Sequence, residues 1–225
     1  MAYEIIIADD HPLYRAALCA AVGSACEGSR IHEAPTVAAL FALLEQCPDP
    51  DLLLLDLNMP GAHGFGALAH LRGAYPQLPV VVVSAMDDPR TVQQALAFGA
   101  QGFISKSADA PAIGRDVHAV LDGMPVAPSG LSPGAAPGPD ATALAVAHRL
   151  AELTPQQFRV FGMLCSGRLN KQIAYELRIS EATVKAHMTA VLRKLGATNR
   201  TQAVLMAGRL AVDPGQIRPP AGDED

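Results

Sequence analysis

Leu52-Leu53-Leu54-Leu55-Asp56-Leu57-Asn58-Met59-Pro60-Gly61 joins four consecutive leucines to an aspartate and a turn. A continuous apolar run without polar alternation is typical of a parallel strand covered on both faces, so we predict a buried strand over Asp51–Leu55. Comparable short runs predict four more strands. They are Ile5–Ala8, Arg30–Glu33, Val80–Val83 and Gly102–Ile104.

Helical patterns separate the predicted strands. Their spans are Leu13–Ala25, Val37–Cys47, Gly64–Tyr75, Pro89–Phe98 and Asp109–Leu121. Strands that alternate with helices indicate a doubly wound α/β domain with a five-stranded parallel sheet, which we place at residues 1–122. Ligands of such sheets bind beyond the carboxyl ends of the strands, so the functional site of this half is expected there.

Polar side chains follow the predicted strands at this edge. They are Asp9, Asp10, Asp56, Ser84 and Lys106. Each has an ordinary alternative, because an aspartate can cap a helix or open a turn and a lysine can simply lie in solvent. Together they predict a site, since an unrelated fold has no reason to place all five at strand ends.

Converging carboxylates repel one another, so the cluster predicts a divalent cation. Ligands that are all oxygen favour Mg²⁺, which binds through one or two carboxylates together with a phosphate. A lysine and a hydroxyl beside the ion are suited to hold phosphoryl oxygens. One of the aspartates could then act as a nucleophile and become an acyl phosphate.

The composition excludes a wholly disordered chain, because 50% of the 225 residues are hydrophobic and only 17% are charged. The net charge of −5 divides unevenly, with −8 over residues 1–122 and +6 over residues 151–212. This division suggests a cation as partner of the first half and a polyanion as partner of the second.

The sequence shows no signal-peptide pattern and no apolar run long enough to cross a bilayer. We therefore expect a cytoplasmic protein without a membrane partner. The four cysteines, Cys19, Cys26, Cys47 and Cys165, form no C-x-x-C pair. We expect them to be buried thiols in a reducing compartment.

Glycine and proline occupy nine of the 17 positions from Gly123 to Pro139, a density that neither a helix nor a central strand tolerates. We predict a linker over residues 123–150, which includes the beginning of a helix over Ala141–Leu153. An acidic tail, residues 213–225, follows the basic part of the chain.

The basic part, residues 151–212, carries four helix start signals, at Thr154, Asn170, Ser180 and Asn199. The predicted helices run through Cys165, then over Lys171–Leu177, Glu181–Leu195 and Arg200–Leu210. The short turn Arg178-Ile179-Ser180 joins the second and third of these helices. Two helices joined by so short a turn indicate a helix-turn-helix.

One face of the predicted helix Glu181–Leu195 is suited to a DNA groove. Lys185, Thr189 and Arg193 are spaced by four residues, with the small Ala186 beside them, and no acidic residue follows Glu181. A basic face with small residues can approach bases in the major groove. The alternative is an ordinary solvated helix face.

The acidic half resembles the receiver domain of two-component response regulators over about residues 4–122. The motifs are Ile7-Ala8-Asp9-Asp10-His11, Leu54 to Gly61, Val83-Ser84-Ala85, and Gly99-Ala100 with Gly102-Phe103-Ile104 and Lys106. The resemblance implies a flavodoxin-like fold with Asp56 as phosphoacceptor. It implies Mg²⁺ ligation by Asp9, Asp10, Asp56 and the backbone carbonyl of Asn58.

By the same resemblance, Ser84 and Lys106 contact the phosphoryl group, and Phe103 is either an aromatic switch or an ordinary core residue. Ser84 replaces the commoner threonine, and Met86 offers no polar group to orient an attacking water. We therefore expect slow loss of the phosphoryl group.

The basic half resembles the LuxR-type helix-turn-helix over residues 150–212. The motifs are Leu153-Thr154-Pro155, Asn170 to Ala174, Ile179 to His187, and Arg193 to Thr201. The resemblance implies base-facing positions at Lys185, Ala186 and Thr189, with a dimer contact on the last helix. It implies phosphate contacts from Lys171, Thr183, Arg193, Lys194 and Arg200.

A receiver domain followed by a LuxR-type helix-turn-helix is typical of the NarL/FixJ class of response regulators. The implied protein is a transcriptional activator that accepts phosphate from a sensor histidine kinase and binds promoter DNA as a homodimer beside RNA polymerase. It is not an enzyme, although the receiver catalyses its own phosphorylation and slow dephosphorylation. A dehalogenase-type phosphatase is an alternative, but it needs an aspartate where Asn58 stands. A ligand-sensing regulator and a constitutive DNA binder with a vestigial receiver are the others.

Overall fold

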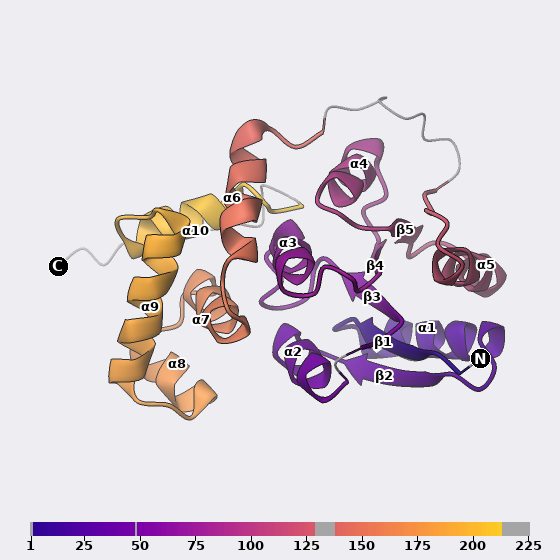
Figure 1. The fold of residues 1–225 in the computed structure, drawn as a ribbon, viewed down its shortest axis with the longest axis horizontal. Coiled ribbons are helices and arrows are strands. Elements are labelled where there is room, and N and C mark those ends of the chain that lie inside the picture. The colour runs from indigo at the N-terminus through magenta and orange to yellow at the C-terminus, as the bar shows by residue number, and fades with distance from the viewer. Residues whose placement is uncertain (1, 48, 129–137, 213–225) are drawn as a thin grey trace.

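Five parallel strands form one sheet in the order β2-β1-β3-β4-β5 (Figure 1). The structure, a computed structural model, describes residues 2–47, 49–128 and 138–212. The strands are β1 (Glu4–Ala8), β2 (Arg30–Ala34), β3 (Leu52–Asp56), β4 (Val80–Ser84) and β5 (Gly102–Ser105). The intervening helices are α1 (Pro12–Ala25), α2 (Val37–Gln46), α3 (Phe65–Ala74), α4 (Pro89–Ala97) and α5 (Ala110–Leu121). The doubly wound α/β prediction is confirmed.

Alternation along the strands divides the core of this domain into two layers. Ile5 and Ile7 of β1 pack with the buried residues of α1 and α5 on one face of the sheet. Ile6 and Ala8 pack with those of α2 and α3 on the other face. Helices therefore cover both faces, which explains why the strands read as continuous apolar runs.

A helical domain follows. Its helices are α6 (Ala141–Ala151), α7 (Pro155–Cys165), α8 (Asn170–Leu177), α9 (Glu181–Leu195) and α10 (Arg200–Gly208). We call the sheet domain the receiver and α7 to α10 the reader. Figure 1 shows α6 lying beside α3, with α7 near α2 and α9 on the side away from the sheet.

The helix-turn-helix has the expected caps, with one correction. Ser180 accepts the backbone N–H of Thr183 at the start of α9, and Gly196 ends that helix in the left-handed region. Asn170 was predicted to cap α8, but it is the first residue of that helix and Leu169 occupies the cap. The Gln172 side chain accepts the Leu169 N–H at 2.8 Å, so the glutamine supplies the cap.

The expectation that all four cysteines are buried is wrong for three of them. Only Cys26 is buried, whereas Cys19, Cys47 and Cys165 are half-buried; all four thiols are free. Residues 129–137 of the predicted linker and the tail 213–225 lie outside the described residues. Within the described ranges, no helix is long and apolar enough to span a membrane.

Candidate functional site

Asp9 and Asp56 meet at the carboxyl ends of neighbouring strands. Asp9 follows β1, and Asp56 ends β3, which pairs in parallel with β1. The Lys106 Nζ lies 2.7 Å from Asp9 Oδ2 and 3.0 Å from Asp56 Oδ2, so one ammonium bridges both carboxylates. Each aspartate is only 1% exposed. The structure thus brings together three of the predicted site residues.

Local backbone bonds orient the two carboxylates. Asp9 Oδ1 accepts the His11 N–H at 2.8 Å, and Asp56 Oδ1 accepts the Asn58 N–H at 3.2 Å. In each case one oxygen is held by the residue two positions on, in the manner of an Asx turn. The other oxygen is directed to Lys106.

Three neighbouring residues surround the pair, and two of them were not singled out from the sequence. Asp10 lies with Asp9 and Asp56 in a group of ligand atoms that are all within 4.8 Å of one another, and His11 belongs to the same group. His11 Nδ1 is 2.9 Å from Asp10 Oδ1. The Tyr14 ring lies beneath Lys106 Nζ, 4.8 Å from ring centroid to nitrogen. The only sequence signal for these two was their position just after Asp9-Asp10.

The electrostatics of this site favour a bound cation. Burial raises the pKa of Asp56 above its ordinary value, although Lys106 opposes this shift. Burial lowers the pKa of Lys106, but Asp9 and Asp56 outweigh that effect and raise it overall. For Tyr14, burial, with Asp9 and Asp56, raises the pKa to about 12. Among the described residues, the three carboxylates face a single ammonium, and the excess of two negative charges fits a divalent cation with oxygen ligands.

Ser84 and Phe103 lie on the adjacent strands. Ser84 ends β4, directly after Val83, the register partner of Asp56. Its side chain is fully buried, and its Oγ accepts the Met86 N–H at 3.1 Å. Phe103 on β5 is also fully buried, in the layer that faces α2 and α3. Its ring is therefore already inside the core.

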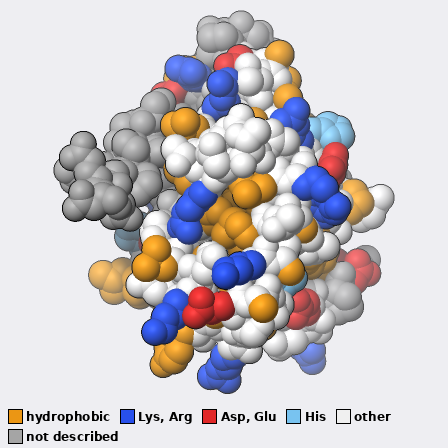
Figure 2. Space-filling view, turned by 90° about the vertical axis from the view of Figure 1, so that its left-hand side faces the viewer, with side chains coloured by type: hydrophobic (Ala, Val, Ile, Leu, Met, Phe, Trp, Pro, Cys, Tyr) orange, Lys and Arg blue, Asp and Glu red, His pale blue; other side chains and the backbone are white. Residues whose placement is uncertain are grey.

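The predicted base-facing residues of α9 lie on an open surface. Lys185, Ala186 and Thr189 are all exposed, as is Arg193. The Thr189 hydroxyl donates to the Lys185 carbonyl at 3.0 Å. Figure 2 looks at the molecule from the reader's side and shows Lys and Arg side chains spread across this face.

The predicted phosphate contacts are less uniform. Lys171 and Thr183 are exposed. The Lys194 Nζ instead donates to the Glu152 carbonyl and to Gln157 Oε1, both at 2.8 Å. Arg200 Nη2 donates to the carbonyls of Leu164 and Arg168. Lys194 and Arg200 therefore also brace the reader itself.

A stack of aromatic rings and the packing of α3 against α6 join the receiver to the helical domain. His70 of α3 is fully buried and stacks on Phe158 of α7, with centroids 4.4 Å apart, and Phe41 of α2 meets both rings edge-on. The His70 Nδ1 lies 3.2 Å from the Leu150 carbonyl. On α3, a Cβ at Gly73 would lie 2.5 Å from Ala151, so the glycine permits the close approach of α6.

The loop between β3 and α3 makes the other contacts. His63 Nε2 donates to the Gly162 carbonyl of α7 at 3.0 Å, and the Phe65 N–H donates to the Leu210 carbonyl just beyond α10 at 2.9 Å. This loop begins directly after Asp56 and includes Asn58. The backbone that carries the acidic site therefore continues into the domain interface.

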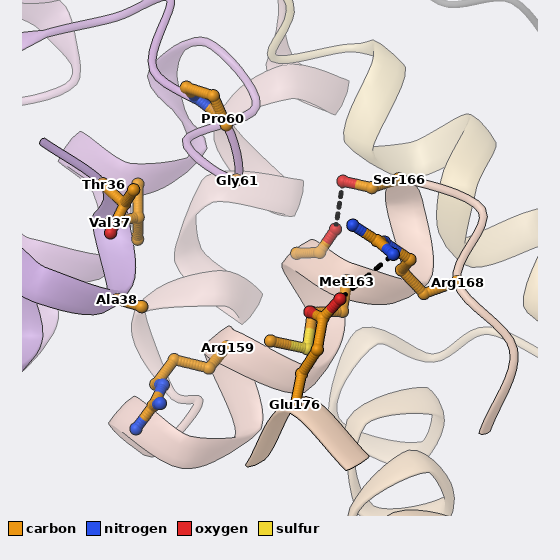
Figure 3. Close-up of a pocket in the computed structure, with 11 residues that line it drawn as sticks. Thr36, Val37, Ala38, Pro60, Gly61, Arg159, Met163, Ser166, Arg168 and Glu176 are labelled. Carbon is orange, nitrogen blue, oxygen red and sulfur yellow. Dashed lines mark hydrogen bonds and ion pairs between the residues drawn. The ribbon is translucent and has the colours of Figure 1, made fainter. Parts of the chain in front are cut away.

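A cavity of about 190 Å³ remains between the two domains. In Figure 3, Val37 and the loop residues Pro60 and Gly61 line it from the receiver, and Met163 of α7 lines it from the reader. Arg168 on its rim pairs with Glu176 at 3.0 Å. The interface is thus closely packed around His70 and more open beside the β3–α3 loop.

Two family models match the chain. Residues 5–118 match the response regulator receiver domain, and residues 151–207 match the LuxR family of bacterial regulatory proteins. The "Glycerol metabolism activator" of Pseudomonas putida is 42% identical over 211 residues, covering 92% of this chain and 95% of that protein. The "Nitrate/nitrite response regulator protein NarL" of Escherichia coli K12 is 31% identical, covering 89% and 93%.

Solved structures share the fold. RcsB from Salmonella enterica serovar Typhimurium, bound to a promoter in the presence of the phosphomimetic BeF3-, superposes with a TM-score of 0.54 at 20% identity, covering 94% of this chain and all of that one. A LuxR family DNA-binding response regulator from Silicibacter pomeroyi is 32% identical, with a TM-score of 0.50, over 56% of this chain and 98% of that one. The chain belongs to the NarL/FixJ class of response regulators, transcription regulators rather than enzymes, with a receiver followed by a LuxR-type DNA-binding domain.

Proposed function

We propose that Asp56 accepts a phosphoryl group from a sensor histidine kinase and that this modification shifts dimerisation and promoter binding towards transcription activation. The observation that carries the proposal is the buried Asp9–Lys106–Asp56 arrangement, with Lys106 Nζ at 2.7 and 3.0 Å from the two carboxylates. Burial raises the pKa of Asp56 and so disfavours the ionised form, which is the nucleophile. Lys106 favours its ionised form.

In the proposed transfer, a carboxylate oxygen of Asp56 attacks the phosphorus of the donor phosphohistidine. The new O–P bond forms as the P–N bond breaks, and the electron pair leaves with the imidazole, which takes a proton from solvent. Lys106 and the Ser84 hydroxyl are placed to hold phosphoryl oxygens. The Ser84 Oγ accepts the Met86 N–H, and this bond leaves the hydroxyl proton available for a phosphoryl oxygen.

The fit of Mg²⁺ rests on the charge of the donor set. Asp9, Asp10 and Asp56, with the backbone carbonyl of Asn58, would hold the ion. When bound, Mg²⁺ neutralises charge on the carboxylates and on the incoming phosphoryl group. His11 donates its backbone N–H to Asp9 and so positions one of these ligands.

The structure supports a route for the signal from Asp56 to the reader through the β3–α3 loop. Asp56 Oδ1 holds the Asn58 N–H, and four residues beyond Met59 the loop donates from His63 to Gly162 of α7. A phosphoryl group would bond to one of the two Asp56 oxygens, which contact the Asn58 N–H and Lys106, and would so disturb one of these contacts. We therefore expect the loop to shift and to loosen or re-seat the reader, in addition to any rearrangement at Ser84 and Phe103.

The reader is proposed to bind a two-fold-related promoter site as a dimer through α10. Lys185, Ala186 and Thr189 would face bases, and Lys171, Thr183, Arg193, Lys194 and Arg200 would meet phosphates. Leu205 on α10 is 62% exposed, so it is available to pack against a second copy of the chain. The Pseudomonas putida relative is named as an activator, which favours contact with RNA polymerase.

The decisive experiment compares the wild-type protein with Asp56→Asn after incubation with acetyl phosphate and Mg²⁺. Intact-mass measurement should show one added phosphoryl group on the wild type and none on the variant. Analytical ultracentrifugation and DNA footprinting should then show more dimer and stronger protection for the wild type alone. Equal footprints for both proteins would leave constitutive DNA binding as the function.

A further inference from the structure

A second cluster of metal-ligating side chains lies at the opposite edge of the sheet from Asp56. Glu4 opens β1, His32 lies within β2, and Cys47 follows the last residue of α2. One donor atom from each, a carboxylate oxygen, a ring nitrogen and a sulfur, lie within 4.8 Å of one another. Three separate elements thus place three different donors together.

The contacts converge on one atom. His32 Nε2 lies 2.5 Å from Glu4 Oε2 and 3.8 Å from Cys47 Sγ. Arg30 contacts the other carboxylate oxygen of Glu4, Oε1, at 3.4 Å and leaves Oε2 facing the histidine. The side chains of His32 and Glu4 are 27% and 34% exposed, so an ion from solvent can reach them.

These distances suit a tetrahedral ion after a small adjustment. Zn²⁺ lies about 2.0–2.3 Å from nitrogen, oxygen and sulfur ligands, which places the donors roughly 3.3–3.8 Å apart. The Sγ–Nε2 distance already agrees. The Glu4 carboxylate must move away from the ring by roughly 1 Å, a change within the freedom of a partly exposed side chain.

The donor set also separates this cluster from the acidic one. Thiolate and imidazole select borderline and soft cations, whereas Mg²⁺ prefers oxygen ligands. A carboxylate and a thiolate carry two negative charges, which match a divalent ion. On binding, the Cys47 thiol and a protonated His32 would release their protons to solvent.

We infer that Glu4, His32 and Cys47 form a second metal site, which takes Zn²⁺ or a similar transition-metal ion with water in the fourth position. The ion would tie the start of β1, β2 and the end of α2 together. Because α2 also carries Phe41 of the domain interface, binding would stiffen the helix that contacts Phe158. The site is independent of phosphorylation at Asp56.

The test titrates the full-length reduced protein with Co²⁺ in the presence of excess Mg²⁺ and reads the near-ultraviolet thiolate-to-cobalt charge-transfer band. One equivalent of Co²⁺ should saturate the band, and Zn²⁺ should abolish it. Cys47→Ser should remove the band, and His32→Ala should weaken binding at least tenfold. The matched control Cys19→Ser, at another half-buried cysteine, should keep the band.

Asp56→Asn should also keep the band, because the acidic site offers no sulfur ligand. Absence of a band in the wild type would overturn the inference, and so would a band that survives Cys47→Ser. Failure of this titration leaves the proposed phosphorylation untouched, since that proposal is read from the mass of the Asp56 variant.

Discussion

His70 of the receiver and Phe158 of the reader lie face to face, with ring centroids 4.4 Å apart and planes inclined by 5°. The Leu150 carbonyl at 3.2 Å requires a proton on Nδ1, so the fully buried Nε2 is the unprotonated nitrogen. Within the described chain Nε2 has no hydrogen-bond partner. A neutral imidazole therefore belongs to the docked arrangement, and a charged one does not.

Acidification should separate the domains. Burial lowers the pKa of His70 from its ordinary 6.5 to about 4 in the docked protein. Between pH 4 and pH 6.5 the undocked form binds more protons than the docked form. Docking therefore weakens as the pH falls through 6.5, and the lost docking stability reaches its full value below pH 4. At pH 5 the lost docking free energy is about 2 kcal/mol, since each pKa unit corresponds to roughly 1.4 kcal/mol.

Small-angle scattering at pH 7.5 and pH 5 should show the wild type expanding. His70→Phe keeps an aromatic ring of similar size without the titratable group, so its profile should change much less between the two pH values. Equal expansion of both proteins would show that another group controls docking.

A side chain at Gly73 should also weaken docking. A Cβ there would lie 2.5 Å from both the Cβ and the carbonyl oxygen of Ala151, and backbone cannot yield as a flexible side chain can. We expect Gly73→Ala to cost about 1–3 kcal/mol of interface stability, the usual range for overpacking. Faster amide hydrogen exchange in α3 and α6 would report the loss.

Gly138→Ala is the control for Gly73→Ala, because no atom of the described residues lies within 4 Å of a Cβ at that position. It should leave hydrogen exchange in α3 and α6 unchanged. A Gly73→Ala protein with wild-type exchange would mean that α6 does not rest on α3 in solution.

Loss of the His63 side chain should uncouple the reader from Asp56. His63→Ala removes the bond to the Gly162 carbonyl, which still accepts from the Ser166 hydroxyl. We expect normal phosphorylation by acetyl phosphate, read by intact mass. The change in DNA affinity on phosphorylation, read by fluorescence anisotropy, should shrink.

Ser84→Ala tests the competing route through Ser84 and Phe103. If the signal travels only by that route, Ser84→Ala will abolish the response and His63→Ala will leave it intact. The reverse result would assign the response to the β3–α3 loop.

The sheet and the acidic site could be predicted because local sequence determines both. A buried parallel strand requires an apolar run, and parallel pairing brings its last residue beside the last residue of its neighbour. Asp9, Asp56 and Lys106 therefore meet as expected. The predicted start of α8 differs from the observed start by one residue. The side chain of Gln172, and not that of Asn170, makes the capping bond, which it accepts from the Leu169 N–H.

The domain interface could not be predicted in the same way. Phe158 is an apolar residue of the predicted helix that ends at Cys165, but nothing in a single sequence says that its partners are Phe41 and His70. These contacts join residues about 90 to 120 positions apart in the sequence. Likewise, the sequence spacing of His32 and Cys47 does not indicate a metal site. The two side chains come together only through the placement of β2 and the end of α2 in the fold.

The phosphorylated state should be long-lived, and Met86 should be one reason. Met86 is half-buried and presents a thioether two residues after Ser84, so it orients no attacking water. We expect the phosphoryl group to be lost over minutes or longer. Mass spectrometry at successive times after removal of acetyl phosphate would measure this loss. Met86→Asn should shorten the lifetime, whereas Met86→Leu should not; a lifetime of seconds in the wild type would exclude this account.

Lys185 and Arg193 should affect DNA binding in different ways. Both are exposed on α9, but Lys185 lies near the helix start, where groove-reading residues sit, and Arg193 lies two turns later. Lys185→Ala should cost about 1–3 kcal/mol on the specific site and relax preference at one base position. Arg193→Ala should weaken binding to all sequences alike and reduce the slope of log affinity against log salt by about 1. Anisotropy titrations on specific and scrambled duplexes at several salt concentrations separate the two. If Lys185→Ala weakens both duplexes equally, Lys185 contacts only phosphate, and base reading must fall to Ala186 and Thr189, whose hydroxyl is already donated to the Lys185 carbonyl.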